Sequence, residues 1–377
     1  MRIAFISTYP PIECGLATYT KYLTDAMKKF KKEIFIVSQI GAKGENTFPV
    51  YAPQHTDIAY RLFHIVEKTA PDIIHIEHEF GLFGSRRGFQ IVDFLLRCKL
   101  TETPVVTTLH TVYTDLSYTE KIIIQHIIDN SSAIIVHETY QKKILEKNYN
   151  HQNKIAVIPH GIRLCKKTVE AKKILGLENK KVILLSGYLR STKCFEKIIK
   201  LFPKIVDQLK NATLLLAIRT RILEHSEYKN YLYELVEKSP VKNNIKVLTG
   251  QFPQYTFDTI LSAADLMALP YTKGGQSGIL SQSSAFELPA VTSNIDSFSH
   301  WCKTVNGGLC CKTDDDYVKN IIKILTDDDY SKQLQQNIRK HNKLICWDKI
   351  ADIHMDIYKK IINGLFSNAE FFYVPKE

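Results

Sequence analysis

The sequence predicts an α/β fold made of two doubly wound domains that follow one another along the chain. Short apolar segments alternate with amphipathic ones throughout, which is typical of βαβ units around a parallel sheet. The pattern pauses in a polar, lysine-bearing stretch after Pro159 and then restarts. A chain of 377 residues also exceeds what one hydrophobic core usually sustains. We therefore expect two Rossmann-like domains that face a central cleft.

The expected strands are short apolar runs that end in polar or turn-forming residues. In the first domain they cover residues 3–7, 34–38, 73–76, 105–109, 133–137 and 155–158. Helical spacing of apolar residues fills 58–69 and 90–100 between them. The second domain repeats this order, with strands expected at 182–186, 213–218, 245–248, 266–270 and 290–293.

We place the domain boundary after the Pro159 turn. The N-terminal domain takes residues 1–165 and the C-terminal domain takes residues 166–349. A last helical stretch near 350–365 has enough isoleucine and aromatic residues to pack on another element. We expect residues 350–377 to cross back and complete the N-terminal domain.

Composition restricts the class of protein. Hydrophobic residues make up 45% of the chain and charged residues 24%, which is ordinary for a soluble globular protein. No apolar run approaches the roughly 18 residues of a transmembrane helix, and the first strand lacks a signal-peptide cleavage site. Eight scattered cysteines without a CxxC pair argue against structural zinc and a disulfide scaffold. We expect a cytoplasmic protein with reduced thiols, no metal and no cofactor.

The formal charge of +11 favours acidic partners such as nucleotide phosphates, anionic lipid or nucleic acid. The densest basic run, 28–32, closes the first expected helix. Its lysines complement a helix C-terminus, or they lie on the inner face of an anionic membrane in a peripheral contact. Nucleic-acid binding would need a basic stripe beside the cleft, and we do not expect that partner.

A glycine- and serine-rich loop follows the apolar strand at 266–270 and leads into a helix. The first N–H groups of a helix have no internal partner and carry partial positive charge, so a phosphate or a polyhydroxyl ligand fits there. Gly274 and Gly278 let the backbone approach a ligand closely, and Ser277 supplies a hydroxyl. The alternative is an ordinary strand–helix connection with a small-residue cap.

Two other strand–helix loops share this design. One reaches a helix start at Gly15, although it is not the G-x-G-x-x-G of a dinucleotide site. The other carries Arg190 and Lys193 beyond a glycine turn, where two cations would neutralise a diphosphate. Arg219 follows the next strand and either contributes to this site or lies in solvent.

Histidines and glutamates end two neighbouring strands of the first domain. Zinc is not favoured, because Glu77 and His78 would point to opposite faces of a strand. His78, Glu79 and, on the next strand, His110 occupy carboxyl ends of strands, where parallel sheets bind ligands. We expect these three to form hydrogen bonds to a ligand, with a structural role as the alternative.

An acidic sequence occurs twice, as TDDDY at residues 313–317 and again at 326–330. The D-x-D-x-D-G spacing of a calcium loop is absent. A threonine N-cap followed by acids in the first helical turn explains both copies.

Taken together, these segments resemble the family 4 glycosyltransferases of the GT-B group. The matching pieces, in the expected order, are STYPPxxCGLATYT, HEFGLFG, TTLHTV, IPHGI, GYLRSTK, AADLMALPY, and QSGIL with LPAV. Cys346, Trp347 and Asp348 resemble the start of that family's crossing helix. The resemblance spans nearly the whole chain and implies transfer of a hexose from a nucleotide-diphosphate sugar, with retention and without a metal.

The resemblance also implies roles for particular residues. Arg190 and Lys193 would hold the diphosphate of the donor, and His110 would contact the transferred sugar. The donor would be UDP- or GDP-linked, and the acceptor a hydroxyl of a glycan, a glycolipid or a small molecule. The expected ligand-binding residues are Gly15, Leu16, His78, Glu79, Arg219, Gln276, Ser277, Gly278, Ile279, Leu280 and Gln282.

The sequence departs from the family in the donor loop. Gly274 and Gln282 stand where the family commonly has two glutamates, and Glu287 stands where a glycine is usual. Gln282 can still accept a bond from a ribose hydroxyl, without the charge. These departures motivate a second hypothesis, a catalytically weakened protein that binds a sugar nucleotide or assists a complex. A protein that binds or glycosylates nucleic acid is a third.

Overall fold

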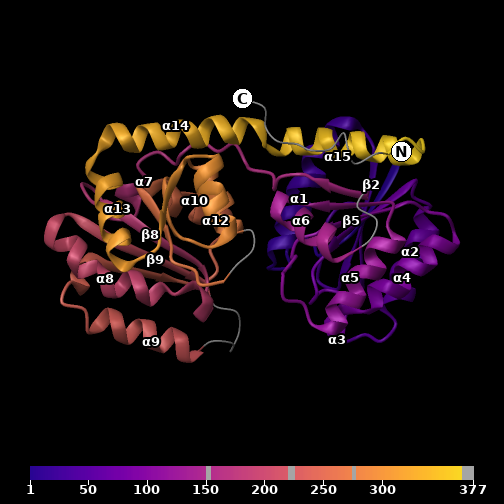
Figure 1. Ribbon diagram of the computed structural model, residues 1–377, viewed down its shortest axis with the longest axis horizontal. Coiled ribbons are helices and arrows are strands. Elements are labelled where there is room, and N and C mark those ends of the chain that lie inside the picture. Colours follow the sequence, from indigo (N-terminus) through magenta and orange to yellow (C-terminus); the bar gives the residue numbers. More distant parts are fainter. Residues whose placement is uncertain (150–153, 220–225, 274–276, 367–377) are drawn as a thin grey trace. The chain divides into compact units, whose positions relative to one another are not determined.

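A computed structural model describes residues 1–149, 154–219, 226–273 and 277–366. The chain forms two compact units. Unit 1 comprises Met1–Gly161 and Ile345–Glu377, and unit 2 comprises Ile162–Leu344. Each unit is a sheet with helices packed on its faces (Figure 1). The expected α/β class with two doubly wound sheets is confirmed.

Unit 1 is built on a seven-stranded sheet of order β3-β2-β1-β4-β5-β6-β7, and every pair of neighbours is parallel. Its strands are β1 Arg2–Ile6, β2 Glu33–Gln39, β3 Thr47–Tyr51, β4 Ile73–His78, β5 Val105–Leu109, β6 Ala133–Val136 and β7 Ile155–Val157. β1 and β4–β7 consist almost entirely of buried residues, as expected for a parallel sheet covered on both faces.

The helices of unit 1 are α1 Gly15–Met27, α2 Ile58–Thr69, α3 Ser85–Gly88, α4 Gln90–Leu100, α5 Tyr118–Asn130, α6 Thr139–Asn148 and α15 Trp347–Ile362. The longer ones are amphipathic and bury one face. The bounds of α2 and α4 are those that the apolar spacing predicts. α5 begins with a capping box, in which Ser117 and Glu120 satisfy each other's backbone N–H groups.

Unit 2 repeats the topology with six parallel strands in the order β10-β9-β8-β11-β12-β13. The strands are β8 Lys181–Tyr188, β9 Ala212–Arg219, β10 Ile245–Thr249, β11 Leu266–Leu269, β12 Ala290–Ser293 and β13 Gly308–Cys311. The helices are α7 Ala171–Ile174, α8 Phe195–Gln208, α9 Ser226–Glu237, α10 Gln254–Ala263, α11 Gly278–Ala285, α12 Asp296–Thr304, α13 Asp314–Thr326 and α14 Asp328–Leu344.

Two strands are absent from the sequence-based prediction. β3 contains Pro49, which interrupts a strand pattern but is tolerated because β3 is an edge strand. β13 is a four-residue strand at the edge of the unit 2 sheet, beside β12. A β-carbon at Gly308 would lie 2.1 Å from the carbonyl oxygen of Ala290, so the glycine permits close pairing with β12.

The last helix packs on the first, since α15 lies against α1 in unit 1 (Figure 1). Lys29 donates to the Asp348 carbonyl at 2.8 Å and pairs with Asp352 at 2.8 Å. The Trp347 ring covers Gly161, where a β-carbon would lie 2.4 Å from the indole. Residues from both ends of the chain therefore complete unit 1.

Candidate functional site

In both sheets the strand order reverses between two central strands, which is where doubly wound proteins bind ligands. In unit 2 these strands are β8 and β11. The loop after β8 carries Arg190 and Lys193, and the loop after β11 leads to α11. The two loops are joined, because Thr272 N donates to the Thr192 carbonyl at 2.9 Å.

Lys193 folds back over Gly187, near the carboxyl end of β8. A β-carbon at Gly187, whose φ is +127°, would lie 2.0 Å from Lys193 Nζ, so only glycine leaves room for the ammonium group. The same ammonium lies 5.2 Å from the centre of the Tyr271 ring. The pKa of Lys193 is lowered to about 7, chiefly by burial and also by the nearby Arg190 and Arg219. No carboxylate of the described residues compensates this ammonium group.

Arg219 completes a group of three cations, the cation cluster (Arg190, Lys193 and Arg219). It ends β9 beside β8, and its guanidinium lies 4.2 Å from the centre of the Phe257 ring. Its Nε atom is buried and has no hydrogen-bond partner among the described residues. Within the part of the chain that the structure describes, no carboxylate forms an ion pair with any member of the cation cluster. Uncompensated cations of this kind suit an anionic ligand.

The start of α11 lies beside this cluster. Ser277 is its N-cap, and the hydroxyl accepts from Leu280 N at 3.3 Å. Ile279 reaches within 3.3 Å of a β-carbon placed on Gly187, so the first turn of α11 lies against the β8 loop. Gly278 is exposed at this helix start, and Gln282 is half-buried one turn further on. Gly274 and Gln276 lie outside the described residues.

Glu287, which stands where the family has glycine, adopts a glycine-like backbone with φ +57°. Its carboxylate forms two bonds with Arg339 of α14, at 2.7 Å from Nε and 2.6 Å from Nη2. Bidentate pairing of this kind is a strong charge-assisted contact. The glutamate at position 287 therefore has a structural role, because it pairs with Arg339.

In unit 1 the strand order reverses between β1 and β4. The loop after β1 ends at Cys14, the N-cap of α1, which makes no side-chain capping bond. Gly15 follows and is exposed, with no atom within 4 Å of a β-carbon placed on it. Leu16 is half-buried against the apolar core. The N-terminus of α1 is therefore uncapped and open.

His110 belongs to a group of three imidazoles, the histidine cluster (His110, His137 and His160). All three surround the buried ring of Tyr19, with centroid distances of 4.7, 5.3 and 5.1 Å. Trp347 of α15 closes the group, with its ring centre 5.0 Å from that of Tyr19. The pKa of His160 is lowered to about 4, chiefly by burial, so this imidazole is neutral at physiological pH.

Glu77 also belongs to this site, although the sequence analysis did not predict that it binds a ligand. Its carboxylate is fully buried, and Oε2 lies 2.8 Å from His110 Nε2. Glu77 pairs with Thr108 across β4 and β5, which brings it next to the residue that follows β5. The alternation of residues along β4 and the paired ends of the two strands are the signals that could have located it.

His78 and Glu79 do not join the histidine cluster. The His78 side chain is buried among apolar groups, with its ring 6.2 Å from that of Phe83 and 5.2 Å from that of Phe80. Burial lowers its pKa to about 3, so the ring is neutral. Glu79 instead accepts a hydrogen bond from the Thr111 hydroxyl. The structure thus brings His110, and not His78, to a partly accessible position.

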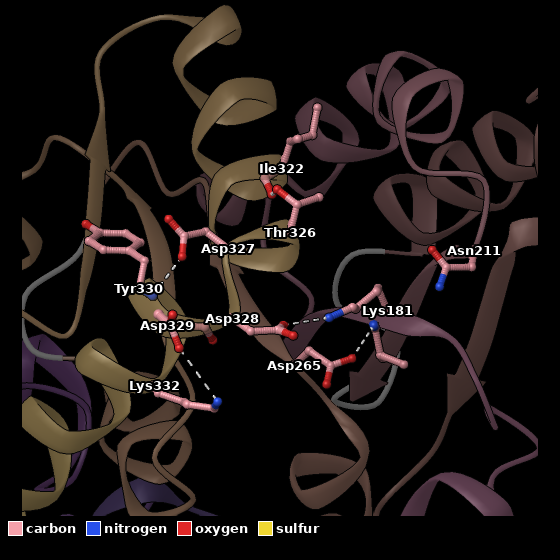
Figure 2. Close-up of polar contacts among 12 residues, drawn as sticks. Lys181, Asn211, Asp265, Ile322, Thr326, Asp327, Asp328, Asp329, Tyr330 and Lys332 are labelled. Atoms are coloured by element: carbon pink, nitrogen blue, oxygen red, sulfur yellow. Dashed lines mark hydrogen bonds and ion pairs between the residues drawn. The ribbon is translucent and has the colours of Figure 1, made fainter.

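The two TDDDY segments are helix starts, but their caps differ. Thr313 caps α13 and forms a capping box with Asp316, as expected. In the second segment the expectation is wrong: Thr326 ends α13 and donates back to the Ile322 carbonyl at 2.8 Å. Asp327 accepts from Tyr330 N at 2.9 Å in its place (Figure 2). The acids that follow pair with lysines, Asp328 with Lys181 at 3.2 Å and Asp329 with Lys332 at 3.8 Å.

No group of three or more possible metal ligands comes together in the described part of the chain. Likewise, none of its helices is both long and apolar enough to cross a bilayer. In the basic run, Lys28 pairs with Asp25 at 2.7 Å and Lys29 is held by α15. Membrane contact by the remaining lysines stays a prediction.

Two family profiles match consecutive parts of the chain. The family profile described as "Glycosyltransferase Family 4" matches residues 15–165, and "Glycosyl transferases group 1" matches residues 167–341. A search of curated proteins finds no match.

Solved structures share the fold over nearly the whole chain. Sucrose-phosphate synthase from Thermosynechococcus elongatus has a TM-score of 0.80 at 15% identity, over 97% of this chain and 100% of its own. Anabaena HepE in complex with UDP-glucose has a TM-score of 0.76 at 14% identity, over 96% and 100%. A glycosyltransferase from Rickettsia africae gives 0.76 at 16% identity, over 96% and 99%. With both family profiles matched in order, the chain belongs to the family 4-like glycosyltransferases of the GT-B fold.

Proposed function

We propose that the protein transfers a hexose from a UDP- or GDP-linked sugar to a hydroxyl acceptor, with retention of configuration and without a metal. The observation that carries this proposal is the cation cluster, which has no carboxylate partner in the described residues and lies where doubly wound sheets bind ligands. A similar structure, HepE, is described as a complex with UDP-glucose, which motivates a nucleotide-sugar as the ligand.

The bond between the anomeric carbon and the diphosphate oxygen breaks in this reaction, and negative charge develops on the diphosphate. Arg190 and Lys193 would stabilise that charge, assisted by the N–H groups at the start of α11. The acceptor oxygen would attack the same face of the sugar, and its proton would leave with the diphosphate. No enzymatic nucleophile is required, and the cations supply charge that a divalent ion would otherwise provide.

The acceptor would be a hydroxyl of a glycan, a glycolipid or a small molecule, and we place the reaction in the cytoplasm. A second candidate function is binding of a sugar nucleotide with little or no transfer. It is suggested by Gly274 and Gln282, which stand where the family commonly has two glutamates. Gln282 lies on the same helix as Ser277, so it retains a polar group without the charge.

A panel of UDP, GDP, ADP and their hexose conjugates, screened by thermal shift, tests the proposal. The best nucleotide-sugar is expected to raise the melting temperature, because a ligand that binds only the native state stabilises it. Release of the nucleoside diphosphate is then followed with and without simple hydroxyl acceptors. Binding without release would support the second function, and no shift with any nucleotide would refute both.

A further inference from the structure

A continuous chain of hydrogen bonds runs through the histidine cluster, from a buried carboxylate to a backbone carbonyl. Glu77 Oε2 lies 2.8 Å from His110 Nε2. His110 Nδ1 lies 3.3 Å from His137 Nε2. His137 Nδ1 lies 2.9 Å from the carbonyl oxygen of Ile158. Each of these three bonds requires one proton between its two heavy atoms.

The protons in this chain can be counted. The Ile158 carbonyl only accepts, so His137 Nδ1 carries a proton. Burial holds the pKa of His137 well below its usual range, so the ring is neutral and its Nε2 is an acceptor. His110 Nδ1 must then donate to it. Two neutral imidazoles supply two protons, and a third proton must lie between His110 and Glu77.

The third proton belongs on the ring. In water an imidazole binds a proton about a hundredfold more tightly than a carboxylate does. The Glu77 carboxylate is fully buried, whereas the His110 side chain is 13% exposed, so water can solvate charge on the ring. Burial raises the pKa of Glu77, and the hydrogen bond from His110 opposes that rise. An isolated buried carboxylate would be costly, and a cationic partner at Oε2 offsets part of that cost. The other oxygen, Oε1, lies 3.5 Å from His75 Nε2 and makes no hydrogen bond among the described residues.

The geometry points to Glu77 as a positioning residue that holds His110 as an imidazolium, with both ring N–H groups directed into the protein. The accessible part of the ring is then a C–H edge that carries positive charge. Such an edge complements the oxygens of a sugar by charge rather than by a conventional hydrogen bond. Only this last consequence rests on the proposed function.

Other titratable groups lie around these hydrogen bonds. They are His75 and His78 on β4, Tyr19 on α1, His160 after β7, and His354 and Tyr358 on α15. The pKa of each of these four histidines is lowered chiefly by burial, and burial raises the pKa of both tyrosines. Around physiological pH these groups stay neutral, so among these described groups Glu77 is the charge that faces His110.

The test follows the His110 ring nitrogens by ¹⁵N NMR from pH 5.5 to 8.5, in protein labelled at histidine and without any substrate. We expect His110 Nε2 to carry a proton in the wild type at pH 6.5, because Glu77 accepts from it, and to lose that proton in Glu77→Gln. The matched control is Glu79→Gln, because that carboxylate accepts from Thr111 instead of His110. The same His110 Nε2 signal in the wild type and in Glu77→Gln would overturn the inference. If Glu77→Gln does not fold, a pyridine-type His110 Nε2 in the wild type at pH 6.5 overturns it.

A kinetic measurement separates this inference from the proposed function. We expect Glu77→Gln to lower kcat about tenfold and to leave KM for the nucleotide-sugar within twofold, with partial recovery in Glu77→Asp. A protein that shows the NMR difference but no turnover would refute the transferase proposal alone. Loss of kcat without the NMR difference would make Glu77 merely structural.

Discussion

In both units, loops follow the two strands between which the strand order reverses, but the polar side chains of these loops differ in their partners. In unit 2 the cation cluster has no carboxylate partner among the described residues. In unit 1 Glu77, His110, His137 and a backbone carbonyl form one series of hydrogen bonds, and among the described residues only the second Glu77 oxygen, Oε1, has no hydrogen-bond partner in that series. A partly buried cation without a counter-ion, such as Lys193, costs free energy that a bound anion can recover, whereas a hydrogen-bonded network mainly fixes geometry. We therefore expect unit 2 to bind an anion and unit 1 to hold its polar side chains in a fixed arrangement.

The largest expected effect tests whether the cation cluster is a ligand site. Arg190→Ala with Lys193→Ala should weaken binding of the best nucleotide-sugar at least 100-fold by calorimetry, because each charged hydrogen bond contributes about 1.5–3 kcal/mol. Lys197→Ala is the control, since that lysine pairs with Asp314 at 2.9 Å. A loss below fivefold in the double variant would break the comparison between the units.

The second prediction concerns the preset arrangement of unit 1. Gly161→Ala should reduce the free energy of unfolding by about 2 kcal/mol, because the new methyl group collides with Trp347. Urea denaturation measures the change. Gly81→Ala, where nothing lies within 4 Å, should cost less than half as much. Equal costs would show that the Trp347 contact adapts freely.

The third prediction uses the pKa of Lys193, which is about 7 in the free protein. The ammonium charge is present below that pH and is lost above it, and a bound anion favours the protonated form. Nucleotide-sugar affinity should therefore fall about tenfold from pH 6 to pH 8. A nucleotide-sugar is the suitable probe, since its diphosphate has no free terminal phosphate that titrates near pH 6. Lys193→Arg should flatten the profile, and an unchanged slope would contradict the assignment.

The smallest expected effect concerns Gly187, where a substitution would both strain the backbone and displace the Lys193 ammonium group. Gly187→Ala should weaken nucleotide-sugar binding about fivefold, because its β-carbon occupies the position of the Lys193 ammonium. Gly250→Ala introduces a β-carbon at a similar φ, +143°, but with nothing within 4 Å. Its affinity should stay within twofold of the wild type. If both variants lose affinity equally, backbone strain rather than displacement is responsible.

Much of the fold follows from apolar spacing alone. The α2 and α4 bounds were predictable because their buried faces repeat at helical intervals, and most strands because they are nearly all apolar. β3 was not, since Pro49 hides an edge strand. The cap of α14 was not, because Thr326 and Asp327 are both good caps and only the backbone chooses between them.

The candidate site divides in the same way. Arg190 and Lys193 lie close together in the sequence and beyond a glycine turn, so local chemistry predicts their proximity. To predict that Arg219 lies near them, one needed to know only that β9 is the neighbour of β8. Glu77 required the register of β4 against β5, and Trp347 required contact between distant segments of the chain. Long-range pairing of this kind has no signature in a single sequence.

The packing of α15 on α1 has a consequence for the order of folding during synthesis. Unit 2 is one continuous segment, whereas the core of unit 1 needs Trp347 and Tyr358, which the ribosome releases after unit 2. The second sheet can therefore close while the first still exposes Gly161 and the buried side of α1. Nascent chains that stop before α15 should hold a protease-resistant unit 2 beside a unit 1 that is still open to cleavage.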